Sequence, residues 1–448
     1  MTFPIQPTHA RRFLSAIALV APGVFLPADA SSTGTRPFGY QLRIREVYVD
    51  NAVDLEDDND DRNHFFRIRS ALWGRCDVGE GFRIYARLTH EFRRYLHPEV
   101  DFEPDEAIFE NLYVRWTNAA GLPVDLTLGR QNVILGEGFL VMDGGPLDGS
   151  RTFYQNGLRA TWRAASETID AVAISNPRKD EYLPVINDQD RNLVESDEVV
   201  LGAYVSSRRW GGTELAPYYF YKREDPRPAA PKRLDLHTIG LRGARRISRS
   251  LKLVAEYALQ HGQRTDDVRA HGGYAYLQIP ADPEGHALTL GVVYLSGERD
   301  RPLGAWNPLL SRWPKWSELY IYTLARESGV ALWQNLASAF LRVDRRLGER
   351  ADGSIRVYAL DAPERRVPGA EGFRGWNLQA EVRFRLHPAV SGHLLAEMFL
   401  PGEFYPGTRV TPEPIVGKAG TQTLPSKVAQ AFGTNDAVFL RWELLFDL

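Results

Sequence analysis

A two-residue alternation of apolar and polar side chains recurs along nearly the whole chain and restricts its fold more than any other feature. In residues 375–386, the apolar set is Trp376, Leu378, Ala380, Val382, Phe384 and Leu386, and the polar set between them is Asn377, Gln379, Glu381, Arg383 and Arg385. An extended strand places two such sets on opposite faces. Segments of about ten residues with this pattern are typical of a transmembrane β-barrel, whose strands face lipid on one side and water on the other.

The alternation predicts about 18 strands, a number in the range of porins with an aqueous lumen. They lie near residues 38–50, 64–74, 82–92, 106–117, 122–132, 155–163, 167–176, 197–207, 213–223, 234–245, 250–261, 271–280, 286–296, 334–345, 353–361, 374–387, 390–400 and 435–448. Short gaps follow every even strand, and long gaps, including 133–154, 177–196, 297–333 and 401–434, follow every odd strand. We therefore predict an all-β, antiparallel up-and-down barrel with short periplasmic turns and long extracellular loops.

The first thirty residues have the features of a secretory signal peptide. Arg11 and Arg12 precede an apolar run from Phe13 to Phe25, and residues 28–30 (Ala-Asp-Ala) form a small-x-small cleavage site. After them, no apolar run approaches the ~18 residues that a membrane-spanning helix needs. We expect residues 1–30 to be a signal peptide and residues 31–448 to be a barrel in the outer membrane of a Gram-negative bacterium.

Charge and cysteine content exclude several other classes of protein. Cys76 is the only cysteine, which rules out an intramolecular disulfide and a cysteine-based metal cluster. The net charge of -3 provides no basic excess for nucleic acid. The acidic stretch 54–61 resembles a calcium loop, but the sixth and twelfth positions counted from Asp57 are Arg62 and Ile68 instead of Gly and Glu. We expect a solvated, charged loop there, and neither a metal nor a cofactor.

Residues 316–332 also resemble a strand. Additional strands at this point would break the alternation of short and long gaps. We therefore assign this stretch to a long loop that folds partly into the lumen.

Two blocks of sequence resemble the alginate-export family of outer-membrane barrels. The first contains Leu-Gly-Arg-Gln at 128–131, Gly-Glu-Gly at 136–138, Pro-Leu-Asp-Gly-Ser-Arg-Thr-Phe at 146–153 and Gly-Leu-Arg at 157–159. The second contains Asn-Pro-Leu at 307–309, Arg312 with Trp313, and 315–320. The resemblance covers essentially the mature chain. It implies a porin of about 18 strands that acts as a single barrel, and the best-understood members conduct the polyanionic polysaccharide alginate. The chain departs from the usual barrel ending, which is an aromatic residue, because it finishes Phe446-Asp447-Leu448.

Transport through a polar pore requires a ring of charges whose field selects the solute, and no bond-making residue. The planar fork of an arginine can hold a carboxylate by two hydrogen bonds. Arg130 has the parity of the lipid-side residue Leu128, so it joins Arg151 and Arg159 near a constriction only if it turns inward at the end of its strand. The predicted pore-lining residues are Arg43, Arg45, Arg67, Arg69, Arg83, Arg87, Arg130, Arg151, Arg159, Arg342, Arg383 and Arg385, and Arg163 is predicted to lie on the same lumen face.

An alternative role for these arginines is to stabilise the barrel wall through ion pairs. The same faces also carry acidic residues, namely Glu91, Asp125, Glu256, Glu381, Glu397 and Glu443. Both roles remain open at the level of the sequence.

We predict a porin, and not an enzyme, that passes anionic solutes, with an anionic polysaccharide such as alginate as a candidate. The alternatives are a barrel enzyme such as a lipid hydrolase and a secreted soluble carbohydrate-binding β-protein. The sequence contains neither a Gly-x-Ser-x-Gly nor a His-Glu-x-x-His motif. The expected partners are outer-membrane lipid, an anionic small molecule or polysaccharide, and the barrel-assembly machinery, with no nucleic acid. We expect a monomer.

Overall fold

The computed structural model describes most of the chain after residue 35. The described residues are 36–100, 102, 104–142, 154–190, 192–227, 230–248, 250–279, 282, 285–298, 304–311, 316–328, 333–365, 371–410 and 431–448. The predicted signal peptide, residues 1–30, lies outside them.

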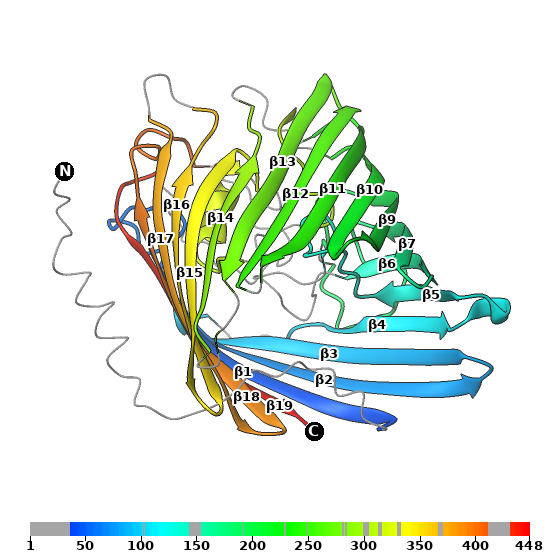
Figure 1. Cartoon of the computed structure of the whole chain (residues 1–448). Helices are drawn as coiled ribbons and strands as arrows, with labels where there is room; N and C mark the ends of the chain where they lie inside the picture. Colours follow the sequence, from blue (N-terminus) through cyan, green and yellow to red (C-terminus); the bar gives the residue numbers. More distant parts are fainter. Residues whose placement is uncertain are drawn as a thin grey trace.

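The strands form one antiparallel sheet that closes on itself (Figure 1). The first strand, β1 (Phe38–Asp50), pairs with the last, β19 (Ala437–Asp447), from Gln41↔Asp447 to Asp50↔Val438. The strands between them are β2 (Asn63–Gly79), β3 (Phe82–His97), β4 (Ala107–Trp116), β5 (Val124–Gln131), β6 (Gln155–Arg163), β7 (Glu167–Asn176), β9 (Glu198–Trp210), β10 (Thr213–Glu224), β11 (Leu234–Ser248), β12 (Leu251–Gln263), β13 (Asp267–Ile279), β14 (Ala287–Leu295), β15 (Leu336–Gly348), β16 (Ala351–Asp361), β17 (Phe373–His387) and β18 (Val390–Pro401). The predicted closed barrel of 18 strands is confirmed.

The remaining strand, β8 (Val185–Ile186), belongs to a loop and not to the regular wall. It pairs with Ala107 and Ile108 of β4, beyond the last β5 partner of that strand, Leu112↔Arg130. The loop between β7 and β9 thus continues the sheet where β5 has already ended.

Every predicted strand is present, and the differences are at the ends. β2 and β3 continue to Gly79 and His97 because their mutual pairing persists almost to both ends. One predicted long gap, between residues 261 and 271, is reduced to residues 264–266, since β12 and β13 remain paired up to Gln263↔Asp267. The alternation of short turns and long loops otherwise holds, and it gives the barrel a short-turn end and a long-loop end.

The outward face of the barrel is apolar. Leu72, Leu128 and Ile355 are each about 60% exposed, as lipid-facing side chains are in the absence of lipid. Large outward aromatic residues such as Phe82 and Trp210 mark the short-turn end, where barrels carry an aromatic girdle. Among the described residues, no helix is long and apolar enough to cross a membrane.

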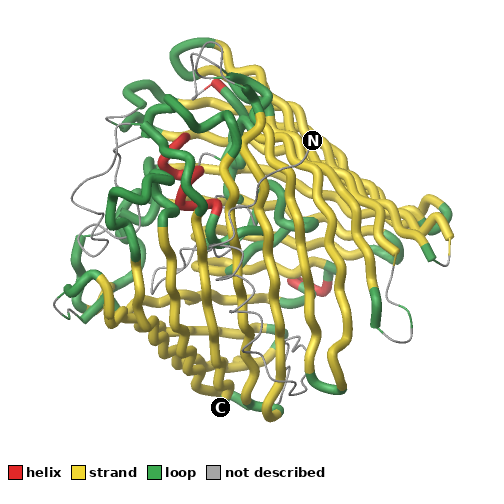
Figure 2. The backbone as a smooth tube through the Cα atoms, turned by 90° about the vertical axis from the view of Figure 1, so that its left-hand side faces the viewer, coloured by secondary structure: helices red, strands yellow, loops and turns green. Residues whose placement is uncertain are grey.

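Two long loops fold into the barrel and build an apolar core inside it. One follows β5 (residues 132–142) and the other joins β14 to β15 (residues 296–335), and we call the described parts of both together the plug. Phe139 of the first loop stacks on Trp306 of the second at 5.3 Å, and the Leu310 amide donates to the Leu140 carbonyl. Figure 2 shows the helix and the longer loop segments on one side of the strands.

Polar groups of the barrel wall hold the plug in place. Lys222 donates to the Leu309 carbonyl (2.7 Å), and Gln260 exchanges two hydrogen bonds with the backbone of Asn307. Arg242 pairs with Glu137 of the first loop at 2.7 Å. On the opposite wall, Glu397 accepts a hydrogen bond from the Ser317 hydroxyl at 2.7 Å. Since buried polar groups need partners, these contacts fix the position of the plug against the wall.

Residues 316–319 form a loop, and α2 (Tyr320–Ser328) follows it. The expectation of a long inward loop at 316–332 is therefore confirmed for the described residues, with the addition of a helix. Arg374 of β17 pairs with Glu327 of α2, and it also donates to the Tyr320 hydroxyl (2.8 Å) and the Asn335 carbonyl (2.9 Å). Both side chains of the ion pair are fully buried.

Removing one member of this pair should loosen α2, because it leaves an uncompensated buried charge. We expect Glu327→Gln to destabilise the packing of α2 against the barrel wall by about 3–5 kcal/mol. Hydrogen exchange of the α2 amides should accelerate, while the amides of β2 and β3 serve as an internal control. The double variant Arg374→Met, Glu327→Leu should restore part of the protection. Unchanged exchange in Glu327→Gln would show that the pair does not hold the helix.

The acidic loop between β1 and β2 differs from the expectation of a solvated loop. Asp57, Asp58 and Asp60 are exposed, but Asp54 and Asp61 are buried. The Asp61 carboxylate accepts hydrogen bonds from the backbone amides at positions 51 (2.6 Å) and 53 (2.7 Å), and burial raises its pKa to about 7. The loop is therefore organised around an internal carboxylate, since short-range hydrogen bonds offer Asp an alternative to water. No group of three potential metal ligands occurs among the described residues.

Candidate functional site

Lumen-facing arginines near the long-loop end are paired and covered. Arg45, Arg67 and Arg69 are each less than 10% exposed. Ion pairs of these three arginines, and of Arg43 and Arg87 beside them, connect neighbouring strands of the wall. They are Arg43–Glu91 (2.9 Å), Arg67–Glu91 (2.5 Å), Arg45–Glu443 (2.5 Å), Arg69–Glu110 (2.7 Å) and Arg87–Glu110 (2.8 Å). The structure therefore brings Arg43, Arg45, Arg67, Arg69 and Arg87 together as a ladder within the wall. This arrangement favours the wall-stabilising role for these five arginines, because each of them is largely buried and already has a glutamate partner.

Arg130 does not join Arg159 at a constriction. Its guanidinium is fully buried and forms two parallel hydrogen bonds with Asp180, at 2.5 and 2.9 Å. It also donates to Asn156 (2.8 Å) and lies over the ring of Tyr154 at 4.0 Å. Because Asp180 of the loop after β7 holds this buried guanidinium, Arg130 is not accessible as a pore-lining group. Arg151, the other expected neighbour, lies outside the described residues.

The short-turn end of the wall from β2 to β6 carries arginines that remain accessible. Arg83, Arg115 and Arg163 are 40–48% exposed at their side chains. Arg83 pairs with Asp77, and Arg115 and Arg163 share Asp125. Arg75 has the same strand parity as Asp77 and therefore lies on the same face of β2. Counting Arg75, four arginines lie beside two aspartates. We call these six residues the basic belt: Arg75, Asp77, Arg83, Arg115, Asp125 and Arg163.

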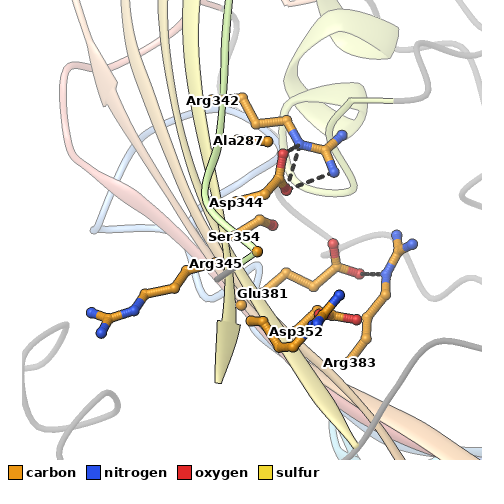
Figure 3. A pocket seen from close by; sticks show the side chains of 11 residues that line it. Ala287, Arg342, Asp344, Arg345, Asp352, Ser354, Glu381 and Arg383 are labelled. Atoms are coloured by element: carbon orange, nitrogen blue, oxygen red, sulfur yellow. Dashed lines mark hydrogen bonds and ion pairs between the residues drawn. The ribbon is translucent and has the colours of Figure 1, made fainter. Parts of the chain in front are cut away.

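A second accessible group lies on β15 to β17. Arg342 pairs with Asp344 at 2.8 Å, and Arg383 pairs with Glu381 at 2.8 Å. Figure 3 shows these four side chains on one side of the strands, lining a recess of about 260 Å³, whereas Arg345 points to the other side. Arginines and acids are balanced here, so this recess contributes exposed charges of both signs.

Two further predicted residues occupy intermediate positions. Arg159 of β6 pairs with Asp170 at 2.8 Å and keeps 28% of its side chain exposed. Arg385 of β17 is half-buried. Of the predicted arginines, Arg83, Arg342 and Arg383 are therefore the most accessible, and the others are engaged within the wall to different degrees.

Two arginines of the basic belt, Arg75 and Arg115, are absent from those predicted to face the lumen, for different reasons. Arg75 lies beyond residue 74, where the predicted strand ends, although β2 continues to Gly79. Arg115 lies within a predicted strand, and the alternation of Tyr113 and Arg115 with Val114 and Trp116 was the signal that places it inward. A register shift between Arg87 and Leu88 in the pairing of β3 with β4 interrupts that alternation further along the strand.

Comparisons with known proteins agree with this architecture. A family model described as alginate export matches residues 35–406. No curated protein is a significant match by sequence. Among solved structures, Pseudomonas aeruginosa OpdO is 13% identical, with a TM-score of 0.55 over 92% of this chain and 97% of its own. OpdQ from the same organism is 13% identical, with a TM-score of 0.55 over 92% and 99%. OpdK, solved with vanillate, is 12% identical, with a TM-score of 0.53 over 92% and 98%.

Proposed function

The chain belongs to the alginate export family and forms a channel in the Gram-negative outer membrane, and we propose that this channel conducts anionic solutes past the basic belt. The family and the porin-like fold support a channel. The charge of the solute is our proposal, and the observation that carries it is the excess of accessible arginines in the belt. Four arginines against two aspartates leave a positive balance on the wall from β2 to β6.

The accessibility of the belt supports a role in conduction. A charge that is buried in an ion pair contributes little to the field at the pore axis, because its partner cancels it at short range. Arg83, Arg115 and Arg163 are open to the lumen and lie at its periplasmic mouth, where the short turns are. A solute from the periplasm would meet these groups first. Fields of this kind raise the local concentration of counter-ions in a confined, water-filled space.

Guanidinium chemistry favours carboxylate-bearing solutes. The planar fork of arginine matches a carboxylate, and several forks at similar height allow exchange from one to the next. Within the class of anions we therefore propose an anionic polysaccharide such as alginate as the physiological solute. The description of the family supports this choice, and the wall chemistry is compatible with it.

The test is the ion selectivity of the purified channel. Full-length protein reconstituted in a planar bilayer under a potassium chloride gradient should give a reversal potential of the sign expected for chloride, because the belt attracts anions. The preference should weaken at high salt, where the Debye length falls to about 3 Å at 1 M. A channel that prefers potassium would contradict the proposal, and so would a folded barrel that gives no channel.

A further inference from the structure

Three aromatic side chains form a continuous row on the lumen face of β2, β3 and β4. Trp73 stacks on Tyr85 with ring centroids 6.3 Å apart and planes at 21°, and Tyr85 stacks on Tyr113 at 5.2 Å and 24°. We call Trp73, Tyr85 and Tyr113 the aromatic row. All three are only partly buried, and none belongs to the apolar core that the plug forms inside the barrel.

Strand register places the aromatic row directly above the basic belt. Tyr85 is opposite Tyr113, and two residues further along, Arg83 is opposite Arg115. Two residues of a strand span roughly 7 Å, which is about the distance across a sugar ring and its carboxylate. The hydroxyl group of Tyr113 lies close enough to Arg83 and Arg115 to interact with both electrostatically.

The wall beside the row leaves space for the rings. Gly39 of β1 is opposite Trp73, and a side chain there would meet the indole at 2.6 Å, so the indole lies against the backbone of β1. On the other side, Gly129 of β5 is opposite Tyr113. The acidic groups near Tyr85 are Glu110 and Asp447. Glu110 is already paired with Arg69 and Arg87, and the four arginines of the basic belt outnumber Asp77, Asp125 and Asp447, so the row faces a net basic environment.

A row of aromatic side chains on a lumen wall has two ordinary explanations, and neither accounts for this one. A membrane-interface girdle faces lipid, and on these same strands that position belongs to the outward stack of Phe82 on Trp116, at 4.9 Å and 13°. A packed core would bury the rings, as it does for Tyr204 and Tyr218, which are only 4–5% exposed. Partly exposed rings in a water-filled lumen are therefore available to a solute.

We propose that the aromatic row and the basic belt together form a saccharide-binding subsite at the periplasmic mouth, specific for uronate sugars. The negative face of an aromatic ring attracts the C–H groups on one face of a pyranose. At the same time, Arg83 or Arg115 pairs with the carboxylate of that sugar. The aromatic contribution distinguishes a uronate oligosaccharide from a simple inorganic anion, to which the arginines alone respond. This inference rests on the proposed anion channel and names the part of the lumen that first engages its solute.

The experiment measures binding and selectivity on the same full-length protein. Binding of a uronic-acid tetrasaccharide is followed by calorimetry in detergent, with a neutral glucose tetrasaccharide and acetate as comparison ligands. The variants are Tyr113→Ala, which removes a ring of the row, and Tyr113→Phe, which keeps the ring. The matched control is Trp116→Ala, which removes a ring of the outward stack on the same strand. Reversal potentials in planar bilayers are recorded for all of them.

We expect Tyr113→Ala to weaken uronate binding about tenfold, and Tyr113→Phe and Trp116→Ala to stay within about twofold of the parent protein. The reversal potential should not change in any of the three, because no charge is altered. If Tyr113→Ala fails to fold, Tyr113→Leu provides the ring-free variant.

The outcomes separate this inference from the proposed function. An anion-selective channel whose uronate affinity is the same in the ring-free variant and the parent would overturn the subsite and leave the anion channel standing. Equal affinity for the uronate and the neutral tetrasaccharide would also overturn it, since the arginines would then play no part. A parent channel without anion preference would refute the proposed function, whereas loss of uronate binding in the ring-free variant would still support the subsite.

Discussion

The double variant Arg83→Gln, Arg115→Gln should lose most of the anion preference of the channel. It changes the basic belt from four arginines and two aspartates to two of each, while Asp125 keeps Arg163 as a partner and Asp77 remains exposed. At about 7 Å in water, each unit charge contributes roughly 0.6 kcal/mol to the energy of a passing ion. Removing two charges therefore lowers the anion-to-cation permeability ratio several-fold, before salt screening reduces the effect. The measurement is the reversal potential under a salt gradient.

Arg345→Gln is the matched control for that variant. Arg345 is also an exposed arginine near the short turns, but it points away from the lumen (Figure 3). Its substitution removes the same charge without changing the lumen, so the permeability ratio should stay at the parent value. If both variants shift the ratio equally, the net charge of the barrel determines selectivity and the belt has no special role.

Replacing residues 304–334 by a short Gly-Ser linker should raise the single-channel conductance several-fold. These residues include Trp306, Leu309 and Leu310, which are fully buried against the inner wall and the first plug loop. Without them, the lumen of an 18-stranded barrel is wide enough for an open aqueous channel. The comparison is the conductance of parent and variant in the same salt, together with the heat-modifiable gel mobility that reports a closed barrel.

A folded variant with unchanged conductance would show that the plug does not narrow the ion path. The fold should persist because the strand pairing around the barrel, including β1 with β19, does not involve the plug. Some loss of stability is expected, since Phe220 and Leu236 of the inner wall lose apolar contacts when the loop is removed. This cost affects the unfolding temperature and does not alter the prediction for a barrel that has closed.

The strands and their order were predictable because each strand is a local pattern. A side chain in a membrane-spanning strand faces either lipid or lumen, so its polarity is determined by its own position. This is why the predicted segments agree with the observed strands, β7 and β10 among them. Strand ends were less certain, since pairing with a neighbour can extend a strand beyond its own alternation, as it does for β2 at residues 75–79.

The accessibility of the arginines was not predictable in the same way. Arg67 and Arg83 both alternate with apolar residues and have the same predicted role. Arg67 is nevertheless buried in an ion pair with Glu91, whereas Arg83 is accessible. Arg130 has lipid parity but ends in a buried pair with Asp180, 50 residues further along the chain. Asp54 and Asp61 appear as part of a charged surface loop and are buried nonetheless.

The sequence alone determined which residues form strands, which face of each strand meets lipid, and which end of the barrel carries the long loops, because all three depend on the polarity of neighbouring residues. The tertiary structure decided which lumen charges are paired, where the plug loops pack and which rings stack across β2, β3 and β4. These features depend on strand register and on contacts between residues far apart in the chain. A two-residue alternation gives the direction of a side chain but carries no information about its partner on the next strand.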